Sequence, residues 1–196
     1  MARGEKKGDN LRLFYGVFIE DRLRDGVVAL QERLREAGGR VTWVKPHNLH
    51  FTLRFIGDTP PDSVADFVQA ARQAAAACSQ FDIQVRGAGA FPSPQSARTI
   101  WLGAAEGADE FKALHAALSD ALDTSGLAKP ERKSFVPHCT LGRVREPPSA
   151  ELAAAIEDNA NAEIGRMKCA EFCLIESTLT GSGPIYETVE AFTLPD

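Results

Sequence analysis

The stretch HFTLRFIG spans residues 50–57, and a related stretch, PHCTLGR, spans residues 137–143. Both contain a His-x-Thr-Leu unit, beginning at His50 and at His138, so two of the four histidines in the chain share one pattern. Residues i and i+2 of a β-strand point to the same face, and each unit therefore presents an imidazole beside a hydroxyl. Two such units that face one another would form a polar cluster suited to acid–base chemistry at a phosphate.

Apolar and polar residues alternate around the first unit, which predicts a strand over residues 49–57 with one face in the core. A second strand is expected over residues 135–144. In the first strand we expect the core face to hold Leu49, Phe51, Leu53 and Phe55, and the opposite face to hold Asn48, His50, Thr52 and Arg54. The candidate functional residues thus lie on the face away from the core.

The rest of the chain predicts an α+β fold, because strands mostly follow one another as antiparallel neighbours with helices as outer cover. Apolar spacing predicts helices that end near Gly38-Gly39 and near Ser125, and Thr59 before two prolines is typical of a helix N-cap. Further strands are expected at residues 11–19, 40–44, 81–91, 98–102, 167–179 and 185–194, and helices at residues 21–37, 59–77 and 108–125, with a short Ala-rich helix after residues 146–149. Residues 1–10 are expected to form a flexible tail and residues 11–196 a single domain of two lobes around a cleft, one His-x-Thr-Leu unit in each.

Composition narrows the class of protein. A hydrophobic fraction of 44% and a charged fraction of 25% are those of a soluble globular protein. No apolar run reaches the length of a membrane span, and the charged start lacks the apolar segment of a secretory signal, so we expect a cytoplasmic protein. The formal net charge of −5 argues against broad binding of duplex nucleic acid but is compatible with one RNA end held in a local pocket.

The four cysteines are irregularly spaced, which favours free thiols over disulfides. Cys169 and Cys173 fall four residues apart in one predicted strand and are the only pair that resembles a metal site, but they lack ligand spacing typical of zinc. The carboxylate clusters that bind Mg²⁺ are missing from the sequence as well. We therefore expect no metal and no cofactor.

The residue types of the two units suit phosphoryl transfer at a cyclic phosphodiester. Histidine titrates near neutrality, so one imidazole can accept a proton from water while the other, protonated, donates to the leaving oxygen. The hydroxyls of Thr52 and Thr140 and a nearby arginine can hold the phosphate oxygens. The other two histidines, His47 and His115, are assigned structural positions.

The segments HFTLRFIG and PHCTLGR resemble the two signature segments of the 2H phosphoesterase superfamily, and most closely its RNA 2′,3′-cyclic phosphodiesterases, also called LigT-like proteins or 2′-5′ RNA ligases. The opening LRLFYGVFI, the central ARTIWLG and the closing ESTLTGSGPIYETVEAFTL are also similar to that family. The resemblance implies a bilobal fold of two antiparallel sheets with outer helices around a central cleft. It also implies metal-independent hydrolysis of RNA 2′,3′-cyclic phosphate ends to 2′-phosphomonoesters.

Carried onto this sequence, the resemblance makes His50 the proton donor to the leaving 3′-oxygen and His138 the base that activates water. Thr52 and Thr140 would hold the phosphate, and Arg143, which matches the arginine of the second signature, is the candidate for a further phosphate contact. The equivalent place after the first unit holds Phe55, so the two half-sites differ chemically.

Two alternatives remain at this point: joining of RNA by the reverse reaction, which forms a 2′-5′ linkage, and a non-catalytic protein that binds RNA ends or nucleotides. The expected partner is RNA with a cyclic phosphate terminus or a small cyclic nucleotide, with no membrane and no obligate protein partner, and we expect a monomer. Phe14 and Tyr15 are candidates for stacking on a terminal base, with a core position as the alternative for both.

Overall fold

The computed structural model describes residues 10–129, 131 and 134–196 of the 196-residue chain. Of the tail predicted for residues 1–10, all but Asn10 lies outside these residues. The order of elements is mixed, and every pair of neighbouring strands is antiparallel, so the α+β class is confirmed. None of the helices in the described ranges is long and apolar enough to cross a membrane.

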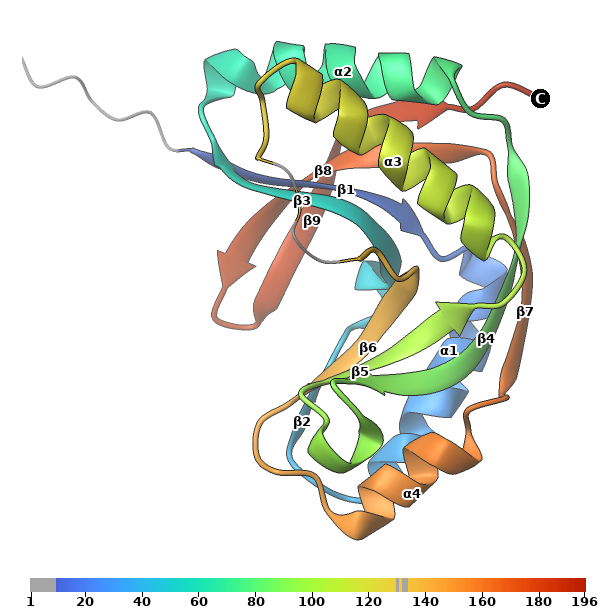
Figure 1. Cartoon of the computed structure of the whole chain (residues 1–196). Helices are drawn as coiled ribbons and strands as arrows, with labels where there is room; N and C mark the ends of the chain where they lie inside the picture. The colour runs from blue at the N-terminus through green and yellow to red at the C-terminus, as the bar shows by residue number, and fades with distance from the viewer. Residues whose placement is uncertain (1–9, 130, 132–133) are drawn as a thin grey trace, which may run out of the picture.

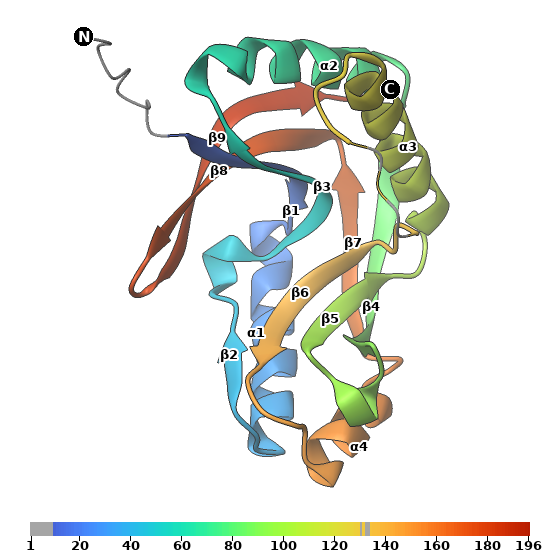
Figure 2. The ribbon, with the colours of Figure 1, turned by 60° about the vertical axis from the view of Figure 1, so that its left-hand side comes forward.

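Within the described residues, nine strands form one strongly curled sheet in the order β7-β4-β5-β6-β3-β1-β8-β9, with β2 paired to β6 (Figure 1). In Figures 1 and 2 the tip of the β8–β9 hairpin projects beyond the rest of the sheet. The strands are β1 (Leu11–Phe18), β2 (Val41–Trp43), β3 (His50–Thr59), β4 (Phe81–Phe91), β5 (Thr99–Ala104), β6 (His138–Val144), β7 (Glu163–Cys169), β8 (Glu171–Thr180) and β9 (Gly183–Thr193).

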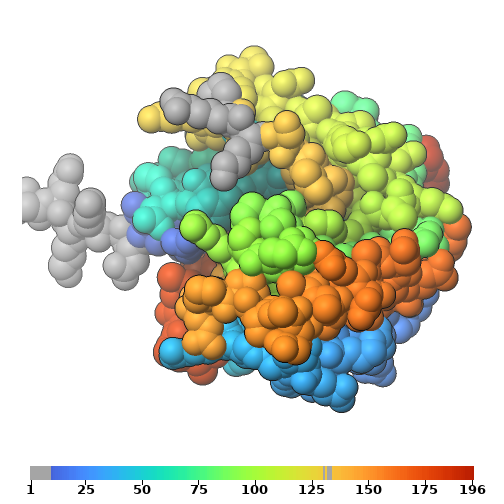
Figure 3. Space-filling model, turned by 60° about the horizontal axis from the view of Figure 1, so that its bottom comes forward, coloured from blue at the N-terminus to red at the C-terminus, as the bar shows by residue number. Residues whose placement is uncertain are grey.

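The helices cover the outside of the curl in two pairs. α2 and α3 pack on each other and contact β9 and β3, whereas α1 and α4 contact β7 and β4. Figure 3 shows α4 between α1 and the connection of β4 to β5. Each helix buries one apolar stripe against the sheet, as the spacing in the sequence predicts. The α-helices are α1 (Asp21–Glu36), α2 (Val64–Ala76), α3 (Ala108–Thr124) and α4 (Ala150–Asp158).

The two halves of the sheet meet at a single point. Only one residue pair, Phe51 with Cys139, joins β3 to β6 among the described residues. Figure 2 shows these strands approaching each other near the middle of the molecule. The two predicted antiparallel sheets are thus the two arms of one curled sheet, with one large buried cluster that draws residues from both arms.

The start of α2 differs from the prediction at Thr59. This residue is the buried end of β3, and its hydroxyl donates to the Gly57 carbonyl instead of capping a helix. A residue that precedes proline avoids the helical region, and this restriction applies to Thr59 before Pro60 and again to Pro60 before Pro61. A 3₁₀ turn, Pro61–Ser63, therefore comes first, and the α-helix begins only at Val64.

The strand predicted over residues 167–179 is two strands. β7 ends at Cys169 and pairs with β4, whereas β8 begins at Glu171 and pairs with β1 and β9. At Ala170 the chain passes from one arm of the sheet to the other. The alternation of apolar and polar residues does not indicate this break, because both strands have a buried face. Cys169 and Cys173 consequently lie on different strands, and the prediction that they share one strand face is wrong.

Candidate functional site

The four polar side chains of the two His-x-Thr-Leu units gather around the pair that joins the two arms. Phe51 and Cys139 are opposite each other, and both are fully buried on the core side. Their neighbours along each strand point to the opposite face. Because the strands are antiparallel there, each histidine is next to the threonine of the other unit: His50 beside Thr140, and His138 beside Thr52.

Both units share a bulge that sequence alternation does not reveal. Tyr15 pairs with Arg54 and Gly16 with Thr52, so Leu53 has no partner on β1. Leu141 is left out of the β5–β6 register in the same way. An extra residue puts two consecutive side chains on one side of the strand. The pattern of burial from His50 to Ile56 is therefore the same as that from His138 to Val144.

The bulge overturns the predicted face of two residues in the first unit. Arg54, expected beside His50 and Thr52, is 2% exposed and points toward α3, whereas Phe55, expected in the core, is 49% exposed and lines the cleft. In the second unit the same position holds Arg143, which also lines the cleft. The sequence predicts that the two half-sites differ chemically. In the structure this difference lies in the cleft, where the first half-site places Phe55 and the second places Arg143.

The backbone fixes the orientation of both imidazoles. Nδ1 of His50 donates to the Asn48 carbonyl at 2.7 Å, and Nδ1 of His138 donates to the Val136 carbonyl, also at 2.7 Å. A carbonyl can only accept, so Nδ1 carries the proton and Nε2 remains for acid–base exchange. Nε2 of His50 lies 3.0 Å from the Thr52 hydroxyl.

Aromatic rings surround His50. Phe14, Tyr186 and Phe18 have ring centroids 4.8, 5.3 and 6.1 Å from its own. Burial among these rings is the main reason that the pKa of His50 is lowered to about 4; the hydrogen bond to Asn48 opposes this shift, and the charges of His138 and Arg143 add to it. In the ligand-free protein His50 is therefore neutral at pH 7.

His138 lies just outside the residues that line the cleft, with the Phe91 ring edge-on at 5.0 Å. The pairing of Phe51 with Cys139 places His138 beside Thr52, and a positive charge on His138 lowers the pKa of His50. Burial, together with the charge of Arg143, lowers the pKa of His138 below its ordinary value, against the opposing hydrogen bond to Val136. Arg143 thus acts on both histidines.

The cleft has a volume of about 640 Å³ and is strongly cationic. Among the described residues, those lining it include four basic side chains and no Asp or Glu, although the chain as a whole has a net charge of −5. The basic side chains are Arg12, Lys45, Arg143 and Arg145. Thr52 and Thr140 line the same cleft. Such a lining suits an anionic ligand.

The two residues considered for base stacking have different positions. Tyr15 is fully buried on the other side of the sheet, where its hydroxyl donates to the Phe67 carbonyl at 2.8 Å, so the stacking interpretation is wrong for Tyr15. Phe14 lines the cleft but is only 4% exposed, because His50 and Tyr186 cover its ring. Phe14 therefore supports His50, and its contact with a base stays a prediction.

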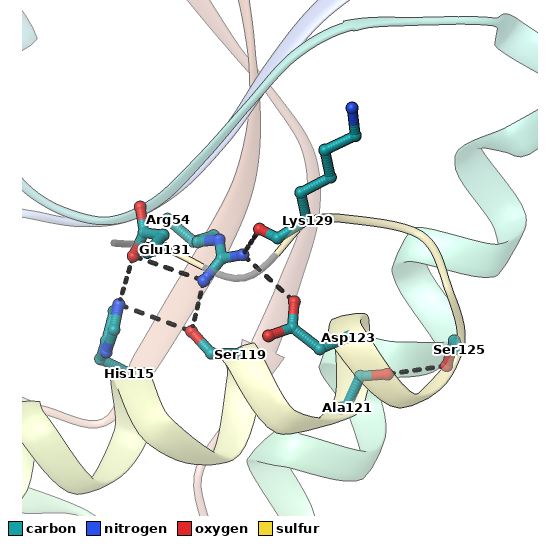
Figure 4. Close-up of polar contacts among 8 residues, drawn as sticks. All are labelled: Arg54, His115, Ser119, Ala121, Asp123, Ser125, Lys129 and Glu131. Carbon is teal, nitrogen blue, oxygen red and sulfur yellow. Dashed lines mark hydrogen bonds and ion pairs between the residues drawn. The ribbon is translucent and has the colours of Figure 1, made fainter. Parts of the chain in front are cut away.

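Arg54 is the centre of a buried polar cluster behind the site (Figure 4). Its guanidinium donates to the Ser119 hydroxyl at 2.8 Å and to the Lys129 carbonyl at 2.6 Å, and it is paired with Asp123 at 3.2 Å and with Glu131 at 3.3 Å. These partners belong to α3 and to the chain that leads from α3 toward His138. Arg54 thus links the strand of the first unit to the segment that precedes the second.

His115 completes this cluster and has the structural position expected from the sequence. Its Nε2 lies 2.8 Å from Glu131, and its ring stacks on Phe135 with a centroid distance of 4.2 Å. His47 is exposed in a short 3₁₀ turn, Pro46–Asn48. Neither lines the cleft.

Sequence reasoning assigned no role to two buried amides that support the site. Asn48 positions His50 through its carbonyl, and its side chain donates to the Pro184 carbonyl at 2.8 Å, which ties the β8–β9 hairpin to the first unit. Gln31 donates to the carbonyl of the bulged Leu141 and to that of Val44, both at 2.9 Å. The sequence does contain a signal for Gln31, because it is a polar residue within the apolar stripe of α1.

The cysteines are free, and three of the four are buried. Burial raises the pKa of the Cys139 thiol to about 12, which makes it an unreactive core residue directly beneath the site. Within the described ranges, His, Cys, Asp and Glu do not form a group of three or more that could hold a metal ion.

Comparisons with known proteins identify the family of the chain. A family model described as the 2′-5′ RNA ligase superfamily matches residues 19–180. The RNA 2′,3′-cyclic phosphodiesterase of Methanothermobacter thermautotrophicus is 38% identical over 94% of this chain and 99% of its own length. The protein of the same name from Archaeoglobus fulgidus is 32% identical over 93% of this chain and 99% of its own.

Solved structures show the same fold. The crystal structure of TT0787 from Thermus thermophilus has a TM-score of 0.77 and 29% identity, and the match covers 94% of this chain and 98% of that one. Escherichia coli LigT in its apo form has a TM-score of 0.71 at 22% identity, with 96% and 100% covered. With the family model across most of its length and relatives above 30% identity, the chain belongs to the 2′-5′ RNA ligase superfamily and, within it, to the RNA 2′,3′-cyclic phosphodiesterases.

Proposed function

We propose that this protein hydrolyses RNA 2′,3′-cyclic phosphate ends to 2′-phosphomonoesters without a metal, with His50 and His138 as acid and base. The observation that carries the proposal is the convergence of His50, Thr52, His138 and Thr140 around the single pair of residues that joins the two arms of the sheet. Both histidines also have Nδ1 bound to a carbonyl, which leaves Nε2 for proton transfer. In-line displacement at phosphorus needs such groups on opposite sides of one phosphate.

In this mechanism Nε2 of His138 takes a proton from water as the water oxygen bonds to phosphorus. The bond from phosphorus to the 3′-oxygen breaks, and Nε2 of His50 gives its proton to that oxygen. The product carries a 2′-phosphate and a free 3′-hydroxyl. His50 ends neutral and His138 protonated, and exchange with solvent restores the starting state.

His50 must become protonated before it can act as the acid. Its pKa of about 4 applies to the ligand-free site, where burial is the main cause of the shift and the charges of His138 and Arg143 add to it. A bound phosphodiester is anionic, so it offsets Arg143 and favours the imidazolium. Thr52, Thr140 and Arg143 hold the non-bridging oxygens, whose charge persists through the transition state. Substrate binding therefore brings with it the uptake of the catalytic proton.

The test is to incubate the protein, in EDTA, with a short RNA that ends in a 2′,3′-cyclic phosphate and to identify the product by chromatography and mass spectrometry. We expect a 2′-phosphate end, and a loss of roughly 10²–10⁴-fold in turnover for His50→Ala and for His138→Ala. His47→Ala, an exposed histidine outside the cleft, is the matched control. Near-full activity in either motif variant would remove that histidine from the mechanism.

Two other outcomes are informative. A 3′-phosphate product would keep the two histidines but reverse which ribose oxygen leaves. Addition of an RNA with a 5′-hydroxyl tests the joining reaction, which the same groups can catalyse in reverse. Because water is abundant and nothing drives joining, we expect hydrolysis to exceed ligation at micromolar RNA.

A further inference from the structure

The cleft extends beyond the His-x-Thr-Leu units to an arginine and an exposed aromatic ring. Arg12 and Phe55 both line it, and the guanidinium carbon of Arg12 lies 4.9 Å from the centroid of the Phe55 ring. Phe55 is 49% exposed, although its neighbours Leu53 and Arg54 are buried. The bulge at Leu53 is what turns this ring out of the core and into the cleft.

Arg12 and Phe55 are separated from the proposed reaction centre by the Phe14 ring. Phe55 is opposite Phe14 across the strands, and the Phe14 ring lies against His50. Arg143 lowers the pKa of both histidines, whereas Arg12 lies on β1 four residues before Gly16, the residue that pairs with Thr52. Arg143 is therefore placed for the phosphate that reacts, and Arg12 is placed for a second anionic group farther along the cleft.

We propose that Arg12 and Phe55 form a subsite for the nucleotide on the 5′ side of the cyclic phosphate, an inference that rests on the proposed function. The base stacks on Phe55, and Arg12 donates to the phosphate that connects the two nucleotides. An aromatic face beside a cation is the arrangement that holds single-stranded nucleic acid without reading its sequence. The substrate is then an RNA strand of two or more nucleotides, and a free nucleoside 2′,3′-cyclic phosphate fills only part of the cleft.

The experiment compares kcat/KM for adenosine 2′,3′-cyclic phosphate with that for the dinucleotide ApA ending in the same group. Stacking of one base is expected to raise kcat/KM for the dinucleotide by about tenfold. Phe55→Ala and Arg12→Ala should remove this gain, and should lower kcat/KM for the dinucleotide by a larger factor than kcat/KM for the mononucleotide. Phe55→Tyr should retain the gain. Arg72→Ala, which removes an exposed arginine on α2 paired with Glu190, is the control for loss of charge.

A binding measurement separates failure of this subsite from failure of the proposed function. Calorimetric titration with adenosine 2′-phosphate and with ApA 2′-phosphate should show tighter binding of the dinucleotide, which Phe55→Ala abolishes. The subsite would be overturned if the mononucleotide is turned over and the dinucleotide shows no gain in kcat/KM. It would also be overturned if the gain survives both substitutions. In either case the proposed hydrolase function would still stand. If neither substrate is turned over, the proposed function fails. In the binding experiment, equal affinity for the two 2′-phosphate ligands would overturn the subsite.

Discussion

Replacement of Arg54 by methionine tests whether the buried cluster holds the two arms together. Methionine keeps an unbranched apolar chain of similar length, so the loss is mainly that of the guanidinium. Arg54 is 2% exposed, whereas the side chains of Asp123 and Glu131 are 27% and 40% exposed. Removal of the arginine therefore leaves two carboxylates that still reach water, together with a Ser119 hydroxyl and a Lys129 carbonyl without their donor.

The expected cost follows from these contacts. Loss of one partner of a buried ion pair costs about 3–5 kcal/mol, and the partial hydration of both carboxylates places this case at the lower end, about 3 kcal/mol. Glu131→Gln should cost less than about 1 kcal/mol, because that side chain is 40% exposed and water can reach the group that replaces the carboxylate. Arg72→Met, at an exposed pair with Glu190, should fall in the same small range.

Urea unfolding followed by circular dichroism measures all three variants under one set of conditions. A loss below about 1 kcal/mol for Arg54→Met would refute the reasoning, since the cluster would then be no stronger than a surface pair. The same variant has a local readout at the site. The Glu131 contact anchors the chain that leads to His138, whose pKa is lowered mainly by burial, so the His138 pKa measured by NMR should rise in Arg54→Met while that of His50 stays low.

Three further predictions concern groups around the site. The pKa of His50, about 4 in the free protein, should rise on binding a nucleoside 2′-phosphate, as NMR titration would show. Because the ordinary pKa of histidine is 6.5, the stability that neutral His50 contributes is complete above pH 6.5 and is lost as the pH falls toward 4. This loss should be absent in His50→Gln. Gly16→Ala would place a Cβ 2.9 Å from the Phe51 carbonyl and 3.2 Å from the His50 ring, so kcat/KM should fall at least about tenfold while Gly181→Ala, in open space, leaves it unchanged. Gln31→Leu removes the donor to two backbone carbonyls and should lower the free energy of unfolding by about 1–3 kcal/mol in urea titrations, a value near zero being contrary to the argument.

The sequence by itself predicted most of the local structure and singled out the candidate catalytic groups. Alternation around His50 and His138 predicts strands, and the apolar spacing and the Gly38-Gly39 pair predict the α1 helix and its end, because these features depend on neighbours within a few residues. The duplicated unit was enough to single out two of four histidines. The family was recognisable for the same reason, since its signature is contiguous in the chain.

Only the tertiary structure decided how these groups come together. The pairing of Phe51 with Cys139 joins segments far apart in the chain, and no local pattern encodes which strands meet. The bulge at Leu53 depends on the register with β1, and it alone sends Arg54 inward and Phe55 into the cleft. Pairing partners and register are set by packing over the whole sheet. A single extra residue in a strand reverses the faces of the residues that follow it, so the alternation in the sequence could not predict the positions of Arg54 and Phe55.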